Sequence, residues 1–211
     1  MVSHNINNRT LKKWRRALNT IVPKPSKEQV NLYLNKWDNL ENYSLQENSL
    51  DKLFFELCPN NTSLPDILIK CSCLNDFYST NIYSIYEAAK HIYELNIDSR
   101  LHQGDLNLVN EIADMTIKNK KKRFYSFATK YCSHHFPNFY PIYDSYVEKV
   151  LIYFNKIDKF SFFKKQDLKD YTRFKSVILD FKRFYKLDEY SIKQIDKYIW
   201  QLGKEYFPRK Y

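Results

Sequence analysis

Glycine is nearly absent from this chain, and long apolar runs are absent altogether. The sequence has 211 residues but only 2 glycines. It therefore holds neither a dinucleotide-binding fingerprint nor a P-loop, because both need glycine where the backbone meets a phosphate. No apolar run approaches the roughly 18 residues of a membrane span, and no signal sequence opens the chain. We expect a soluble, cytoplasmic protein that has no membrane partner.

Paired cysteine ligands are missing as well. The four cysteines, Cys58, Cys71, Cys73 and Cys132, do not have the spacing of a zinc site or of an iron–sulfur loop. An isolated Cys-Ser-Cys is a weak metal signal. We interpret all four as reduced thiols, and we expect neither a metal nor an organic cofactor.

Positive charge and aromatic side chains are abundant. The formal net charge is +10 and the isoelectric point is about 9.2, which favours a polyanionic partner such as DNA. Part of this basicity also fits the lysine-rich and asparagine-rich coding of an AT-rich genome. Aromatic residues make up 17% of the chain, with 18 Tyr and 15 Phe. A chain of this length fits a single domain of one body or of two interleaved lobes.

Helical periodicity recurs along most of the chain, so the sequence predicts an all-α fold. Apolar residues at three- and four-residue steps and polar residues at helix starts indicate about ten helices. No segment alternates cleanly between apolar and polar residues, so we expect no strand beyond a two-residue pairing. The expected helices span residues 10–21, 26–37, 46–58, 63–71, 85–95, 105–115, 124–136, 144–155, 167–186 and 191–202.

The stretch from residue 124 to residue 151 is the most informative part of the chain. Its first half places Phe124, Phe127, Ala128 and Tyr131 on one helical stripe. Prolines at 137 and 141 then end that helix and force an extended crossing. Asp144 follows, where a carboxylate ordinarily opens a helix by accepting orphan backbone N–H groups. A plain helix cap is therefore one interpretation of Asp144.

The same stretch resembles the core of the helix-hairpin-helix DNA glycosylase superfamily. Ser126-Phe-Ala128 stands where that family opens a helix with Lys-Thr-Ala or Ser-Thr-Ala. The segment from Pro141 through Val147, Pro-Ile-Tyr-Asp-Ser-Tyr-Val, is similar to the Pro-Ile-Leu-Asp-Gly-Asn-Val of the adenine-specific branch. The resemblance implies a compact, two-lobed helical body with a cleft between the lobes. It also implies a middle lobe of about residues 75–150 and a second lobe of 10–74 and 151–211, within one domain of residues 1–211.

The resemblance assigns catalytic roles to three residues. Asp144 stands at the position of the family's catalytic carboxylate, which stabilises positive charge on the deoxyribose as the base leaves. Enzymes of the family that also cut the strand carry a lysine at the Ser126 position and form a Schiff base. Serine there implies a monofunctional enzyme that leaves an abasic site. Lys130 lies one helical turn further on and offers a displaced amine as an alternative.

A polar and aromatic segment matches the place of the family's base pocket. A pocket that reads an extruded base needs hydrogen-bonding groups for its edge and aromatic faces for stacking. A capped turn between helices is the alternative interpretation of this segment. The candidate pocket residues are Asn75, Tyr78, Ser79, Thr80 and Asn81, together with Tyr143 beside the carboxylate.

A basic run precedes the central helix, where the family has a glycine-containing hairpin that grips a DNA phosphate. This chain has neither glycine nor proline there, which is its largest departure from the pattern. Five positive charges could hold phosphates of double-stranded DNA electrostatically, although a solvated basic loop explains them equally well. They are Lys118, Lys120, Lys121, Lys122 and Arg123.

Two other functions stay open at this point. Adjacent His134 and His135 suggest acid–base cleavage of RNA, although neighbouring residues on a helix point about 100° apart. A non-catalytic nucleic-acid-binding protein on the same fold is the second alternative. The sequence predicts a monomer. It does not identify the excised base, which could be damaged, mispaired or hypermodified, in DNA repair or in antiviral defence.

Overall fold

The computed structural model describes residues 22–208, most of which are helical, and this confirms the predicted all-α fold. No helix in this range is both long and apolar enough to cross a membrane. The α-helices are α2 (Lys27–Trp37), α3 (Glu41–Asp51), α4 (Leu64–Phe77), α5 (Ile85–Glu94), α6 (Asp98–His102), α7 (Asn107–Ala113), α8 (Tyr125–His135), α9 (Ser145–Asp158), α10 (Tyr171–Phe184) and α11 (Ile192–Tyr206). A π-helical turn, Lys52–Leu57, extends α3, and a 3-10 helix spans Lys165–Lys169.

Side-chain caps fix the starts of four helices. Ser26 and Ser191 accept backbone hydrogen bonds at the starts of α2 and α11, as their sequences predict. Asp144 and Asp170 do the same for α9 and α10. Ser63 precedes α4 without a capping hydrogen bond from its side chain. The helix expected over residues 10–21 lies outside the described residues.

The expectation that strands would not exceed a two-residue pairing was wrong. Strands β1 (Asp114–Ile117) and β2 (Lys120–Arg123) form an antiparallel hairpin in which Ile117 pairs with Lys120. Lys118 and Asn119 connect them with φ angles of +48° and +61°, as a two-residue hairpin turn requires. The pattern was hidden because every side chain of β2 is exposed, so the basic run has no apolar alternation.

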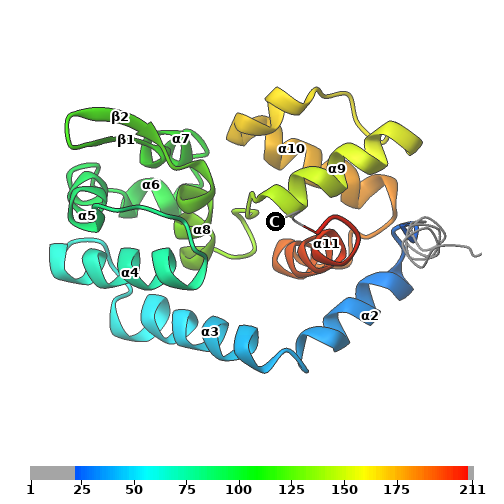
Figure 1. Ribbon diagram of the computed structural model, residues 1–211, viewed down its shortest axis with the longest axis horizontal. Coiled ribbons are helices and arrows are strands. Elements are labelled where there is room, and N and C mark those ends of the chain that lie inside the picture. The colour runs from blue at the N-terminus through cyan, green and yellow to red at the C-terminus, as the bar shows by residue number, and fades with distance from the viewer. Residues whose placement is uncertain (1–21, 209–211) are drawn as a thin grey trace, which may run out of the picture.

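The helices form two lobes, as Figure 1 shows. The first lobe contains α3–α8 and the hairpin, with α4 packed against α5 and α8. The second contains α2, α9, α10 and α11, with α11 packed against α2 and α9. The chain crosses between the lobes at residues 38–40 and 136–144. The sequence placed these boundaries differently, near residues 74 and 150.

Gly203 permits a close helix approach in the second lobe. It lies inside α11, which continues to Tyr206, whereas the helix expected from the sequence ends at residue 202. A Cβ atom at this position would lie 2.7 Å from Cβ and 2.9 Å from the carbonyl oxygen of Tyr146, in the first turn of α9. Only glycine avoids this overlap, so the backbone of α11 lies directly against the start of α9.

Candidate functional site

A pocket of about 760 Å³ lies between the two lobes. Its walls come from α3, the end of α4, the first half of α8, the start of α9 and one face of α11. Both lobes therefore contribute side chains. Eight of the residues singled out from the sequence line it: Tyr78, Ser79, Thr80, Arg123, Ser126, Lys130, Tyr143 and Asp144.

Asp144 is both a helix cap and a pocket residue. Its Oδ1 accepts hydrogen bonds from the backbone N–H groups of Tyr146, at 2.7 Å, and Val147, at 3.0 Å. The side chain is half-buried and lines the pocket. The capping interpretation is therefore confirmed. Because the carboxylate also adjoins a cavity, the cap is compatible with a chemical role.

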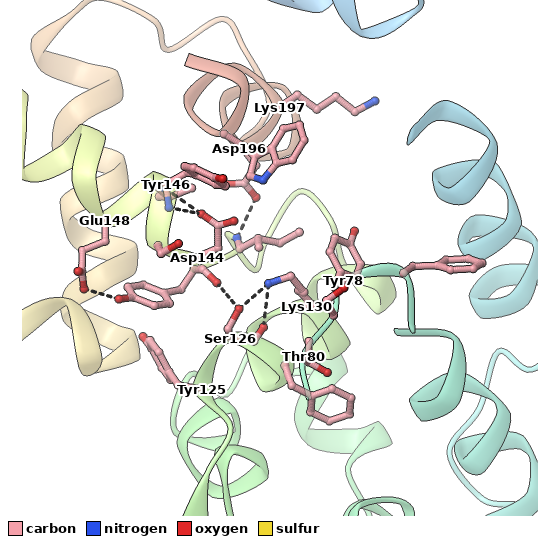
Figure 2. A pocket seen from close by; sticks show the side chains of 18 of the residues that line it. Tyr78, Thr80, Tyr125, Ser126, Lys130, Asp144, Tyr146, Glu148, Asp196 and Lys197 are labelled. Carbon is pink, nitrogen blue, oxygen red and sulfur yellow. Dashed lines mark hydrogen bonds between the residues drawn. The ribbon is translucent and has the colours of Figure 1, made fainter. Parts of the chain in front are cut away.

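Ser126 and Lys130 form a hydrogen-bonded pair across from Asp144 (Figure 2). The Lys130 ammonium donates to Ser126 Oγ at 2.5 Å, and that hydroxyl donates to the carbonyl oxygen of Tyr143 at 3.1 Å. Lys130 is only 4% exposed, and its Nζ lies 5.0 Å from the centre of the Tyr78 ring. The pair holds a buried positive charge at the pocket wall.

Asp196, on α11, is a pocket residue that the sequence reasoning missed. Its Oδ2 accepts a hydrogen bond from the Ile142 N–H at 2.9 Å, whereas Oδ1 is buried and has no hydrogen-bond partner. Burial and, to a smaller extent, the Asp144 charge raise the pKa of this carboxyl group to about 8, although the Ile142 hydrogen bond and the charges of Lys193 and Lys130 act against them. The sequence contained a signal, because Asp196 lies beside Ile195 on the buried stripe of an amphipathic helix.

Aromatic rings and lysines of the second lobe extend the site. Trp200 packs edge-on against Trp37 at 5.9 Å and Tyr43 at 5.1 Å between ring centres, and all three line the pocket. Lys193 and Lys197 pair with Glu47 at 3.0 and 2.7 Å. These pairs join α3 to α11 across the pocket. The sequence offered no way to bring these distant segments together.

A second polar group lies further along the same wall. Tyr143 donates a hydrogen bond to Glu148, and Lys169 donates to the Tyr143 hydroxyl. Burial raises the pKa of Glu148, but the Tyr143 hydrogen bond and the Lys169 charge outweigh it and hold that pKa below its usual value. Tyr143 therefore lines the pocket while its hydroxyl is held by Glu148 and Lys169, which line the same wall.

Two predicted pocket residues serve the turn instead. Asn75 Oδ1 accepts from Thr80 Oγ1 and from the Ile82 N–H, both at 2.8 Å. Asn81 is exposed and donates to the Ser79 carbonyl at 3.1 Å. Neither of the two asparagines lines the pocket. The structure therefore places both in the local turn that short amide side chains readily close, and not in the pocket wall where the sequence prediction put them.

The basic hairpin lies at one edge of the site. Of its five positive residues, Arg123 lines the pocket, and it contacts Asp114, Asn110 and the carbonyl of Lys169. The lysine side chains are exposed on the strands and the turn. The predicted DNA-binding set therefore splits into one pocket residue and four surface residues.

The two histidines do not line the pocket. His134 and His135 are 1% and 9% exposed, and burial lowers both pKa values well below the usual value. His134 Nε2 meets the Tyr78 hydroxyl at 2.9 Å, and His135 Nε2 meets the Asn61 amide at 3.1 Å. Since neither imidazole reaches the cavity, the geometry offers no support for histidine-dependent RNA cleavage there.

The described part of the chain holds no cluster of three or more His, Cys, Asp or Glu side chains suited to a metal ion. The four cysteines are unpaired. The polar side chains that line the pocket include carboxyl groups, lysine ammonium groups and hydroxyls.

Comparison with known proteins gives a family. The HI_0787_N model, described as an N-terminal domain, matches residues 29–139, which end within the second crossing between the lobes. A protein of Haemophilus influenzae (strain ATCC 51907 / DSM 11121 / KW20 / Rd), described as an uncharacterized protein, is 52% identical over 161 residues, or 76% of this chain and 73% of that protein. No solved structure matches the chain. The chain belongs to the HI_0787_N family.

Proposed function

We propose that this protein is a monofunctional DNA N-glycosylase. It would hydrolyse the bond between deoxyribose and a damaged, mispaired or hypermodified base that has swung out of the duplex, and would leave an abasic site. The observation that carries the proposal is the position of Asp144. Its carboxylate is fixed by the N–H groups of its own helix and adjoins a pocket large enough for a base.

Fixed negative charge is what glycosidic cleavage needs. As the base leaves, positive charge builds on the sugar, and a preorganised carboxylate beside C1′ stabilises it. Asp144 does not have to reorganise, because two backbone N–H groups already hold one of its oxygens. Its other oxygen is the group assigned to the sugar and to the attacking water.

The opposite wall favours hydrolysis over strand cleavage. Ser126 cannot form a Schiff base, and its hydroxyl is held between Lys130 and the Tyr143 carbonyl. The Lys130 ammonium, buried at this wall, supplies positive charge for an anionic part of the substrate such as a phosphate. This assignment keeps Ser126 and Lys130 as binding and orienting groups.

Aromatic and basic residues around the pocket suit an extruded nucleotide. A flipped base is held by stacking and by hydrogen bonds to its edge, and the pocket offers the rings of Tyr78 and Tyr143 with the hydroxyls of Ser79 and Thr80. Its volume of about 760 Å³ lies within the usual range for small-ligand sites. Lysines on the pocket walls supply the charge that a DNA strand needs. They include Lys169, Lys193, Lys197 and Lys204.

The test is base release with a matched control. The wild-type protein, Asp144→Asn and Asp170→Asn are incubated with genomic DNAs that carry different base modifications, and abasic sites are scored by alkali cleavage. Asp170 caps α10 through the Arg173 N–H at 2.9 Å but does not line the pocket, so it controls for loss of a cap. We expect Asp144→Asn to lose about 100-fold or more in rate and Asp170→Asn to keep the wild-type rate.

Other outcomes would count against the proposal. Base release that persists in Asp144→Asn would contradict the role of this carboxylate. If the wild-type protein binds DNA tightly and salt-dependently but releases no base from any DNA, the protein is a non-catalytic binder on this fold.

A further inference from the structure

The pocket contains a further aspartate that the proposed function has not used. Asp196 lies on α11, and Figure 2 shows it on the same side of the pocket as Asp144. One of its oxygens is fixed by the Ile142 N–H at 2.9 Å. The other, Oδ1, is buried without a hydrogen-bond partner. A buried polar atom without a partner is costly and is rarely kept without a reason.

We propose that Asp196 is a second catalytic residue, a carboxylic acid that gives its proton to the base as the glycosidic bond breaks. This role rests on the proposed glycosylase function. Asp144 acts on the sugar while Asp196 acts on the leaving base. Two carboxyl groups in one pocket can take these different roles when their surroundings keep one ionised and the other protonated.

The surroundings of Asp196 favour a protonated carboxyl group. The residue is 5% exposed, and its hydrogen bond to Ile142 satisfies only one oxygen. Burial is the main reason that its pKa rises to about 8, and the neighbouring Asp144 charge acts in the same direction. The hydrogen bond from Ile142 and the charges of Lys193 and Lys130 oppose the shift. Burial and, to a smaller extent, the Asp196 charge raise the pKa values of Tyr78 and of Tyr171 on α10. Lys193 is itself paired with Glu47 on α3.

The proposed step balances without any further reactant. The bond between C1′ and the ring nitrogen breaks, and its electron pair goes to the base. The proton of Asp196 moves to a nitrogen of that base, and the oxygen of a water molecule bonds to C1′. The water proton passes through Asp144 to solvent, and Asp196 takes up a proton from solvent to restore the starting state.

This role also narrows the substrate class. A proton donor helps only a base with a ring nitrogen that accepts a proton as it leaves. We therefore infer that the excised base derives from adenine, guanine or cytosine. Bases derived from uracil or thymine leave more readily as anions, and they gain least from an acid in this position.

The experiment compares wild-type protein, Asp196→Asn and Asp51→Asn on the DNA from which the wild type releases most base. Asp51, on α3, is a matched control because burial also raises its pKa, yet it does not line the pocket. Single-turnover rates are measured from pH 5.5 to 9.5, and the released base is identified by mass spectrometry. The wild-type rate should fall as pH rises through about 8. Asp196→Asn should be about 100-fold slower at pH 6 and should lack that fall, while Asp51→Asn should behave as wild type.

The outcomes separate the two proposals. Equal wild-type and Asp196→Asn rates at every pH, or release of a uracil- or thymine-derived base, would overturn the role of Asp196 and leave the glycosylase intact. No base release by the wild type from any DNA would overturn the glycosylase and the Asp196 role together. If Asp196→Asn does not fold, the wild-type profile alone decides, because a rate that stays flat from pH 6 to 9 would refute the proton donor.

Discussion

Two buried polar clusters in this protein look alike in composition but differ in what they face. The closed cluster surrounds Lys70, which is fully buried and donates to the carbonyls of Cys58 and Asn60 and to the Asn61 side chain at 2.7–3.0 Å. The pocket cluster consists of Ser126, Lys130, Asp144 and Asp196, which line the cavity between the lobes. Both clusters place a lysine ammonium beneath the surface of the first lobe.

The two clusters differ in whether their buried polar atoms have hydrogen-bond partners within the cluster. In the closed cluster, Asn61 is also bonded to the Tyr131 hydroxyl at 2.5 Å and to Asp98 through its backbone N–H at 2.8 Å. In the pocket cluster, Asp196 Oδ1 has no partner. Buried charge alone therefore does not mark a functional site. A buried charge beside a cavity, with an oxygen left unsatisfied, is the more informative combination.

The strongest way to test this contrast is to remove each lysine in turn. Lys70→Met leaves several buried acceptors without a donor, so it should lower the free energy of unfolding by about 3–5 kcal/mol. Lys130→Met should cost about 1 kcal/mol, because Ser126 keeps its bond to the Tyr143 carbonyl. Urea denaturation measures both values.

Base release should follow the opposite order. Folded Lys70→Met, assayed at low temperature, should retain the wild-type rate, whereas Lys130→Met should lose about 10-fold or more. If Lys70→Met proves the less destabilised of the two, the distinction between a structural and a functional lysine fails.

A medium effect is expected from Asp196. Because its pKa is about 8 in the folded protein and near the usual 3.8 when unfolded, the unfolded chain releases its proton first as pH rises. Wild-type stability from this group is complete below about pH 4 and is lost between pH 4 and 8. Asp196→Asn lacks this loss, so its stability relative to wild type should rise with a slope of up to about 1.4 kcal/mol per pH unit. Urea denaturation at pH 5, 6 and 7 measures the slope, and parallel curves for both proteins would refute it.

The smallest effect belongs to the exposed charges of the hairpin. Lys121 shares a strand face with Arg123, which lines the pocket, whereas Lys120 and Lys122 point to the other face. Lys121→Gln should weaken duplex binding several-fold and reduce the salt dependence by about one phosphate contact. Lys120→Gln should change less. Fluorescence anisotropy measures duplex binding by both variants at salt concentrations from about 50 to 200 mM, where the loss of a phosphate contact changes the affinity. Equal effects of the two substitutions would argue against DNA lying along the face that carries Lys121.

Local signals in the sequence predicted much of the fold. Helix periodicity and the capping residues Ser26, Asp144 and Ser191 gave the helices and several of their starts. The hairpin escaped notice because β2 consists of exposed basic residues, and such a strand has no hydrophobic pattern to read. Propensity and periodicity describe neighbours along the chain, so they did not reveal that α3 and α4 join the first lobe.

The pocket was predictable only where its residues are close in sequence. Ser126, Lys130 and Asp144 lie in one stretch and do line it. Asp196, Lys197 and Trp200 come from the final helix and reach the pocket through tertiary packing alone. The sequence showed an acidic residue on the buried stripe of this helix, but it did not show that Asp196 lies near Asp144.

Gly203 has a consequence for how the two acids are spaced. Asp196 is on α11 and Asp144 opens α9, and these helices meet where Gly203 touches Tyr146. The distance between Asp144 and Asp196 therefore depends on how closely α11 approaches α9 at Gly203, which has no side chain. Enlarging that residue would wedge the acids apart without altering either of them. The size of the residue at position 203 thus controls the distance between Asp144 and Asp196. Substitutions there would change the geometry of the site while both carboxyl groups are kept.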